Sequence, residues 1–144
     1  MRKHRAEARW NGGLKGGEGE VKSGNGAVQS KYSYASRFGD SNSGTSPEEL
    51  IGAAHSGCFS MFLSALLEKE NLTPEYVETK AVVTLGEQDG APTVTKIDLT
   101  TDVKAQGLGN EKLQQLAQDA KKGCPISKAL GAVPEITLQA TLKE

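Results

Sequence analysis

Two cysteines are the residues of this chain best suited to chemistry. Cys58 lies in the middle of the run SPEELIGAAHSGCFSMFLSALLEKE, and Cys124 stands between Gly123 and Pro125. An ionised thiol is a nucleophile, and its oxidation to sulfenic acid or disulfide is reversible. A free cysteine is also a common small core residue, so an inert, buried role is the alternative for each thiol.

Polar residues close to Cys58 in the sequence favour a reactive thiol. His55 comes one helical turn before Cys58, where it is placed to act as a base or a hydrogen-bond neighbour. A backbone carbonyl or a carboxylate could equally satisfy a helix histidine. Glu48 lies roughly 80° around the predicted helix from Cys58, whereas Glu49 lies on the opposite side and suits the capping box S-x-x-E.

An arginine could connect Glu48 to the thiol. Glu48 precedes Cys58 by about 15 Å along a helix that rises about 1.5 Å per residue, which is too far for direct contact. An arginine side chain can pair with a carboxylate at one point and with a thiolate at another. Arg37, in the loop before the helix, is placed to do so. A solvated surface charge is its other interpretation.

Cys124 stands where a helix is expected to begin. Pro125 suits the first position of a short helix over 125–130, which puts Cys124 at or near the N-cap. The positive end of the helix dipole favours a thiolate there. Sequence spacing alone does not show whether Cys124 comes within disulfide distance of Cys58.

Composition and charge exclude several other classes. The two cysteines and two histidines form no C-x-x-C or H-x-x-x-H pattern, so we expect no metal site. The net charge of −1 provides no general attraction to nucleic acid. No apolar signal segment follows Met1, and we expect a cytoplasmic protein whose thiols are kept reduced.

The run from Ser46 to Glu70 predicts one long helix that carries Cys58. Ser46 is a good N-cap, Pro47 suits the first helical position, and apolar residues recur at three- and four-residue steps. No Asp, Glu, Lys or Arg occurs between Leu50 and Leu67. We therefore expect this helix to be covered on most sides, and the apolar run is too short to favour a membrane span.

The other elements complete an α+β fold in a single domain, residues 1–144. Alternation and glycine-rich turns predict three N-terminal strands that form an antiparallel meander, followed by a loop over 35–45. After the long helix we expect a hairpin, a second helix capped by Asn110 and ended by Gly123 as its C′ residue, a short helix and a final strand. The predicted ranges are 2–10, 14–22, 27–34, 77–87, 93–104, 111–122, 125–130 and 135–142.

The runs TSPEELIGAAHSGCFSMFLSALL and KKGCPISKAL closely resemble the OsmC/Ohr family of thiol-dependent hydroperoxide reductases. The resemblance covers nearly the whole chain. His55 and the R-F pair of the preceding loop look more like the OsmC branch than the Ohr branch. The resemblance implies an intertwined homodimer with two active sites at its interface and no metal, prosthetic group or other cofactor.

The resemblance also implies roles for single residues. Cys58 matches the peroxidatic cysteine and Cys124 the resolving one. Arg37 matches the arginine that activates the thiolate, with Arg9 as the alternative, and Glu48 matches the glutamate that holds this arginine.

The function expected from these matches is a cytoplasmic peroxidase for oxidative or osmotic stress defence. It would reduce organic hydroperoxides, and hydrogen peroxide less well, through a Cys58 sulfenic acid and a Cys58–Cys124 disulfide that an external dithiol reduces. Two alternatives stay open: a redox sensor or binding module that uses the same thiols, and a structural dimer with inert thiols. We expect neither nucleic acid nor a membrane as a partner.

Overall fold

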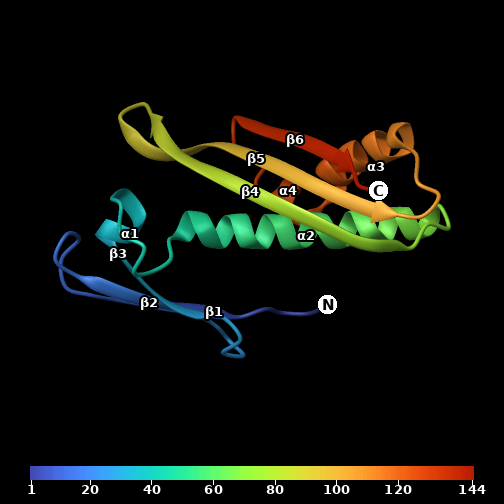
Figure 1. Ribbon diagram of the computed structural model, residues 1–144. Coiled ribbons are helices and arrows are strands. Elements are labelled where there is room, and N and C mark those ends of the chain that lie inside the picture. Colours follow the sequence, from blue (N-terminus) through green and yellow to red (C-terminus); the bar gives the residue numbers. More distant parts are fainter. The chain divides into compact units, whose positions relative to one another are not determined.

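The computed structural model describes residues 1–144, which divide into two compact units, Met1–Leu50 and Ile51–Glu144. The predicted organisation as a single domain stays a prediction. Figure 1 labels the elements, and its α+β composition agrees with the expected fold class. The elements in chain order are β1 (Ala6–Asn11), β2 (Glu18–Ser23), β3 (Gln29–Ser33), α1 (Tyr34–Phe38), α2 (Pro47–Lys69), β4 (Pro74–Gln88), β5 (Ala91–Ala105), α3 (Asn110–Gly123), α4 (Pro125–Ala129) and β6 (Glu135–Leu142).

The first unit holds the expected antiparallel meander, in the order β1-β2-β3. Its strands are shorter than the alternation predicts, because the turn before β2 runs from Gly12 to Gly17 and takes up the start of the expected second strand. Gly12 adopts a φ of 90°, which favours glycine, and the amide of Gly17 donates to the carbonyl of Gly13 across 2.8 Å.

The expected loop over 35–45 is wrong at its start, because Tyr34–Phe38 form the short helix α1. Two hydroxyls make this turn helical. The amide of Ser36 donates to Ser33 Oγ over 3.1 Å, and the amide of Ser33 donates to Ser36 Oγ over 2.8 Å. This reciprocal capping box uses serine in place of the usual Glu or Gln, and it puts Arg37 on a fixed helical turn.

Helix α2 begins as predicted. The amide of Glu49 donates to Ser46 Oγ across 3.1 Å, so Ser46 caps the helix. The second half of the expected capping box is absent, because the Glu49 carboxylate accepts a hydrogen bond from Thr45 Oγ1 at 3.2 Å. Glu48 and Glu49 lie in the first turn, where the helix dipole favours negative charge.

The expectation that α2 is covered on most sides does not hold within one chain. Phe59, Leu63 and Leu67 are fully buried, but Met61 is 78% exposed and an apolar stripe of small residues lies beside it. By length and composition the helix could cross a membrane, and only 28% of its most apolar window is buried. Core helices of ordinary domains pass the same test, so one such helix is only weak evidence for a membrane span.

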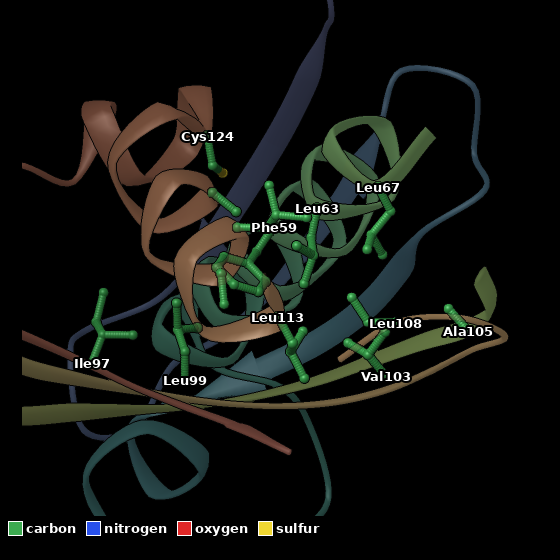
Figure 2. Close-up of a cluster of buried hydrophobic side chains, with 13 residues drawn as sticks. Phe59, Leu63, Leu67, Ile97, Leu99, Val103, Ala105, Leu108, Leu113 and Cys124 are labelled. Carbon is green, nitrogen blue, oxygen red and sulfur yellow. The ribbon is translucent and has the colours of Figure 1, made fainter. Parts of the chain in front are cut away.

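The second unit contains the sheet β4-β5-β6, with α2 running along it (Figure 1). Strands β4 and β5 form the predicted hairpin, and Asp89 and Gly90 supply the positive φ angles of its turn. Strand β6 pairs with β5 in parallel, as a strand that returns after the crossover through α3 and α4. The main hydrophobic core lies between side chains of α2, β5 and α3 (Figure 2).

Helix α3 buries the predicted apolar face, which Leu113, Leu116, Ala117 and Ala120 form. Its caps differ from the prediction. Gly109, not Asn110, is the N-cap, and Gly123 is the last helical residue rather than the C′ glycine. Glycine is needed at 123 for space, because an added Cβ would lie 2.8 Å from the ring of Phe62.

Candidate functional site

The second unit brings the two predicted cysteines together. The Sγ atoms of Cys58 and Cys124 lie 2.9 Å apart, and both thiols are free. A disulfide bond measures about 2.05 Å, so the two sulfurs are in close contact without a covalent bond. Cys58 is half-buried in the middle of α2, whereas Cys124 is fully buried (Figure 2 labels Cys124). This proximity makes the pair a candidate dithiol–disulfide site.

The break between α3 and α4 fixes the backbone of Cys124. The amide of Cys124 donates to the carbonyl of Ala120 across 2.9 Å, which closes α3. The carbonyl of Cys124 then accepts from the amide of Lys128 at 3.0 Å, which opens α4, with Pro125 in the first turn. Cys124 is thus the N-cap of α4, as the sequence predicts.

The surroundings of the two thiols push their acidities apart. Burial raises the pKa of Cys58, and its hydrogen bond with Cys124 raises that pKa further. Burial also works to raise the pKa of Cys124, but the hydrogen bonds from Cys58, Ser127 and the Ile126 amide together lower it below its ordinary value. Within this unit the environment therefore raises the pKa of Cys58 and lowers that of Cys124.

His55 lies in the same buried cluster, although it contacts neither sulfur as a hydrogen-bond partner. Its Nε2 is 2.7 Å from Ser127 Oγ, and its Nδ1 is buried with no partner. Burial lowers the pKa of His55, which keeps the imidazole neutral.

The first unit brings together the other two predicted site residues. Arg37 Nη2 lies 2.8 Å from Glu48 Oε1, and Arg37 Nε donates to both carboxylate oxygens at 3.2 Å. The Glu48 side chain is only 9% exposed, so its charge needs a partner of this kind. The hydrogen bond to Glu48 raises the pKa of Arg37, which stays charged. The guanidinium also lies 5.0 Å from the centre of the Phe38 ring.

Arg9, the alternative to Arg37, has a different partner. Its Nε donates to Asn11 Oδ1 over 3.0 Å in an exposed position on β1. This leaves Arg37 as the arginine that Glu48 holds.

Ser127 is the residue of this site that the sequence reasoning missed. It is the third residue after the N-cap Cys124, at the position from which a side chain reaches back toward a cap. The spacing C-P-x-S was a usable signal, but the partner His55 lies 72 residues away in the chain and could not be found from spacing. Nowhere do three His, Cys, Asp or Glu side chains gather in a way that could hold a metal ion.

This chain is similar in sequence to curated proteins over two thirds or more of its length. The chain is 41% identical to peroxiredoxin OsmC of Escherichia coli over 140 residues, which is 96% of each protein. It is 32% identical to the organic hydroperoxide resistance protein OhrA of Bacillus subtilis over 66% of each chain. These identities put it nearer to the OsmC branch than to the Ohr branch.

Solved structures show the same fold. An OsmC-like protein of Vibrio cholerae, 19% identical, superposes with a TM-score of 0.77 over 98% of this chain and all of its own. The organic hydroperoxide resistance protein OhrB of Bacillus subtilis, 27% identical, gives 0.63 over 96% of this chain and 98% of its own. The family model described as OsmC-like protein matches residues 39–139. The chain is a member of the OsmC-like family.

Proposed function

We propose that this protein is a thiol-dependent peroxidase that reduces organic hydroperoxides, and hydrogen peroxide less well. The observation that carries the proposal is the 2.9 Å separation of two free sulfurs in a buried site. The names of the relatives, peroxiredoxin and organic hydroperoxide resistance protein, agree with this chemistry. A reducing compartment such as the cytoplasm suits thiols that must be restored after each turnover.

Cys58 is the attacking residue in this proposal. Its thiolate attacks the distal oxygen of the peroxide, the O–O bond breaks, and the alkoxide leaves and takes up a proton to become the alcohol. The Cys58 sulfur is oxidised to sulfenic acid. The exposed side of α2 near Met61 and the half-buried Phe62 provide apolar surface for a hydroperoxide with an apolar organic group.

Cys124 resolves the sulfenic acid. Its thiolate attacks the Cys58 sulfur, an S–S bond forms, and the S–O bond breaks with loss of water after proton uptake. The short distance between the sulfurs supports this step, because little movement is needed to reach bonding distance. An external dithiol then reduces the disulfide and returns both thiols.

Arg37, held by Glu48, is proposed to activate Cys58. The second unit on its own raises the pKa of Cys58, so a peroxidatic role for this residue requires a cation from elsewhere. Arg37 donates from Nε and Nη2 to the largely buried Glu48 carboxylate, which fixes the orientation of its cationic guanidinium. In the proposal its guanidinium lowers the Cys58 pKa and stabilises charge on the peroxide oxygens as they separate.

A homodimer is part of the same proposal. One chain leaves apolar surface uncovered on the outer side of α2, and the first unit has a groove lined mainly by Ala6, Ala8, Val21, Val28 and Leu50. A second copy that covers such surfaces agrees with the intertwined dimer that the family resemblance implies.

A steady-state assay tests the proposed function. The reduced protein is supplied with a dithiol and with either an alkyl hydroperoxide or hydrogen peroxide, and loss of peroxide is followed. We expect multiple turnovers with a higher kcat/KM for the alkyl hydroperoxide, and none for Cys58→Ser. Turnover by Cys58→Ser would contradict the assignment of the attacking residue. A single oxidation without turnover would favour a redox sensor that uses the same thiols.

A further inference from the structure

The two sulfurs of the candidate site differ in how easily a reagent can reach them. Cys124 is fully buried and belongs to the main hydrophobic core, whereas Cys58 is half-buried. Phe62 covers the chain just before Cys124, because a Cβ added at Gly123 would lie 2.8 Å from its ring. A reagent that approaches Cys124 therefore meets packed side chains first.

Hydrogen bonds hold the backbone on both sides of Cys124. Its amide donates to the carbonyl of Ala120 over 2.9 Å, and its carbonyl accepts from the amide of Lys128 over 3.0 Å. Three residues after Cys124, Ser127 Oγ lies 2.7 Å from Nε2 of the fully buried His55 on α2. Exposure of Cys124 would require some of these contacts to open, which makes it a rare local event.

Cys58 lies at the boundary between the exposed and the buried side of α2. At about 100° per residue, three exposed residues lie on one side of Cys58 around the helix: Ala54, Gly57 and Met61. The fully buried Phe59 lies on its other side. Apart from the helix backbone and the chain neighbours of Gly57, nothing lies within 4 Å of a Cβ added there. A small thiol can therefore reach Cys58 without opening the fold, as the proposed peroxide step also requires.

We propose that the external dithiol attacks the Cys58 sulfur of the Cys58–Cys124 disulfide, so that Cys124 is the leaving group and Cys58 carries the mixed disulfide. The inference rests on the proposed function, since it assigns the two sulfurs their roles in the reductive half of the cycle. Thiol–disulfide exchange can begin at either sulfur, and access is one of the factors that decide between them. In the folded chain access favours Cys58.

Each step of this reduction exchanges one sulfur–sulfur bond for another. A thiolate of the dithiol bonds to Cys58 Sγ, the Cys58–Cys124 bond breaks, and Cys124 leaves as a thiolate that takes up a proton. The second thiol of the dithiol, as a thiolate, then attacks the dithiol sulfur of the mixed disulfide. The dithiol is thereby oxidised to a cyclic disulfide, and Cys58 is released as a thiolate, the form that the peroxide step uses.

A monothiol locates the attacked sulfur, because it cannot close a ring and so leaves the mixed disulfide long enough to be trapped. The full-length protein is oxidised with diamide, freed of the oxidant, mixed with excess 2-mercaptoethanol and quenched with acid at short times. Digestion with pepsin in acid, where exchange is arrested, and mass spectrometry then assign the adduct to a cysteine peptide. At times extrapolated to zero, we expect Cys58 to carry the adduct at least about ten times as often as Cys124, because Cys124 reacts only after local opening.

Urea provides the matched control in the same chain. In fully denaturing urea both sulfurs are exposed, and the adduct should be shared between them within about threefold. Below the unfolding transition, the rate of adduct formation at Cys124 should rise with urea while the rate at Cys58 stays nearly constant, because only the reaction at Cys124 requires exposure of buried surface.

Two outcomes would overturn the proposal: an adduct found mainly on Cys124 in the folded protein, or the same distribution in the folded and the denatured protein. Because diamide forms the disulfide without peroxide, the test does not depend on peroxidase activity. If the adduct lies on Cys58 but an alkyl hydroperoxide oxidises neither thiol, the proposed function fails while the assignment of the attacked sulfur stands.

Discussion

At the scale of single residues, the proton distribution between the two thiols is the feature that decides the mechanism. Burial and the Cys124 contact raise the pKa of Cys58, whereas several donors lower that of Cys124. The thiol proposed to attack peroxide is therefore the less acidic one within its own unit. A cation must reverse this order for the peroxide step, and this requirement is the physical reason for assigning Arg37 to Cys58.

Replacement of Arg37 tests that assignment. Arg37→Met should slow the reaction of Cys58 with an alkyl hydroperoxide roughly 100-fold, because a preorganised cation at the developing charge is lost. Glu48→Gln should slow it less, since the arginine remains but its bidentate anchor is weakened. Pre-steady-state oxidation measures both rates. Arg9→Met is the matched control, and a loss with Arg9→Met but not with Arg37→Met would assign the role to Arg9.

His55 predicts how stability depends on pH. Burial lowers its folded-state pKa below the ordinary value of 6.5. As the pH falls through 6.5, the unfolded chain takes up a proton that folded His55 refuses, so the free energy of unfolding decreases. Denaturant titrations between pH 8 and about 5 should show this decrease, and His55→Gln should flatten it. An unchanged slope in His55→Gln would contradict a buried, neutral histidine.

The sequence predicted the position of a candidate site residue where that residue's own neighbours determine it. Cys124 was identified as a helix cap from the adjoining Pro125, and Arg37 was paired with Glu48 through the geometry of one helix start. Ser127 was missed, because its hydroxyl gains meaning only from His55, which the fold brings near. The contact between the two sulfurs likewise depends on packing, which spacing does not encode.

At the scale of elements, periodicity predicted strands and helices well and their pairing poorly. The buried face of α3 and the range of β6 agree with the alternation of apolar residues. The parallel pairing of β6 with β5 was not predicted, because it depends on the crossover and not on the strand's own residues. Helix α1 was missed because serine replaces the usual acidic residue of a capping box.

The packing of α3 predicts that substitutions at two positions of this helix lower the free energy of unfolding by very different amounts. Leu113→Ala should lower the free energy of unfolding by about 2–5 kcal/mol, because Leu113 is fully buried in the core of the second unit. Gln118→Ala, at an exposed position of that helix, should change it by less than about 0.5 kcal/mol. Equilibrium urea unfolding measures both, and equal losses would contradict the packing described for α3.

At the scale of the whole molecule, one chain leaves apolar surface exposed, and we expect a partner chain to bury it. The outer side of α2 exposes Met61 beside small apolar residues, and the groove of the first unit includes the half-exposed Val28. Contiguous apolar surface of this kind marks an interaction site in most soluble proteins. The same apolar residues give α2 the composition of a membrane-spanning helix.

Light scattering coupled to gel filtration tests the proposed dimer. We expect a particle of twice the mass of one chain. Val28→Glu should shift it toward the monomer, because a charge in an apolar interface is costly. Val82→Glu is the control: Val82 is 62% exposed on β4, between the exposed Lys80 and Thr84. A monomeric wild-type protein would contradict the proposed assembly.

The most direct test of the central claim is the intact mass under non-reducing conditions, after a small excess of alkyl hydroperoxide is added to the reduced protein. The two-cysteine cycle predicts loss of two hydrogens within seconds, no change for Cys58→Ser, and one added oxygen for Cys124→Ser. An unchanged mass, with both thiols still free to react with an alkylating agent, would contradict a peroxidase that works through Cys58 and Cys124.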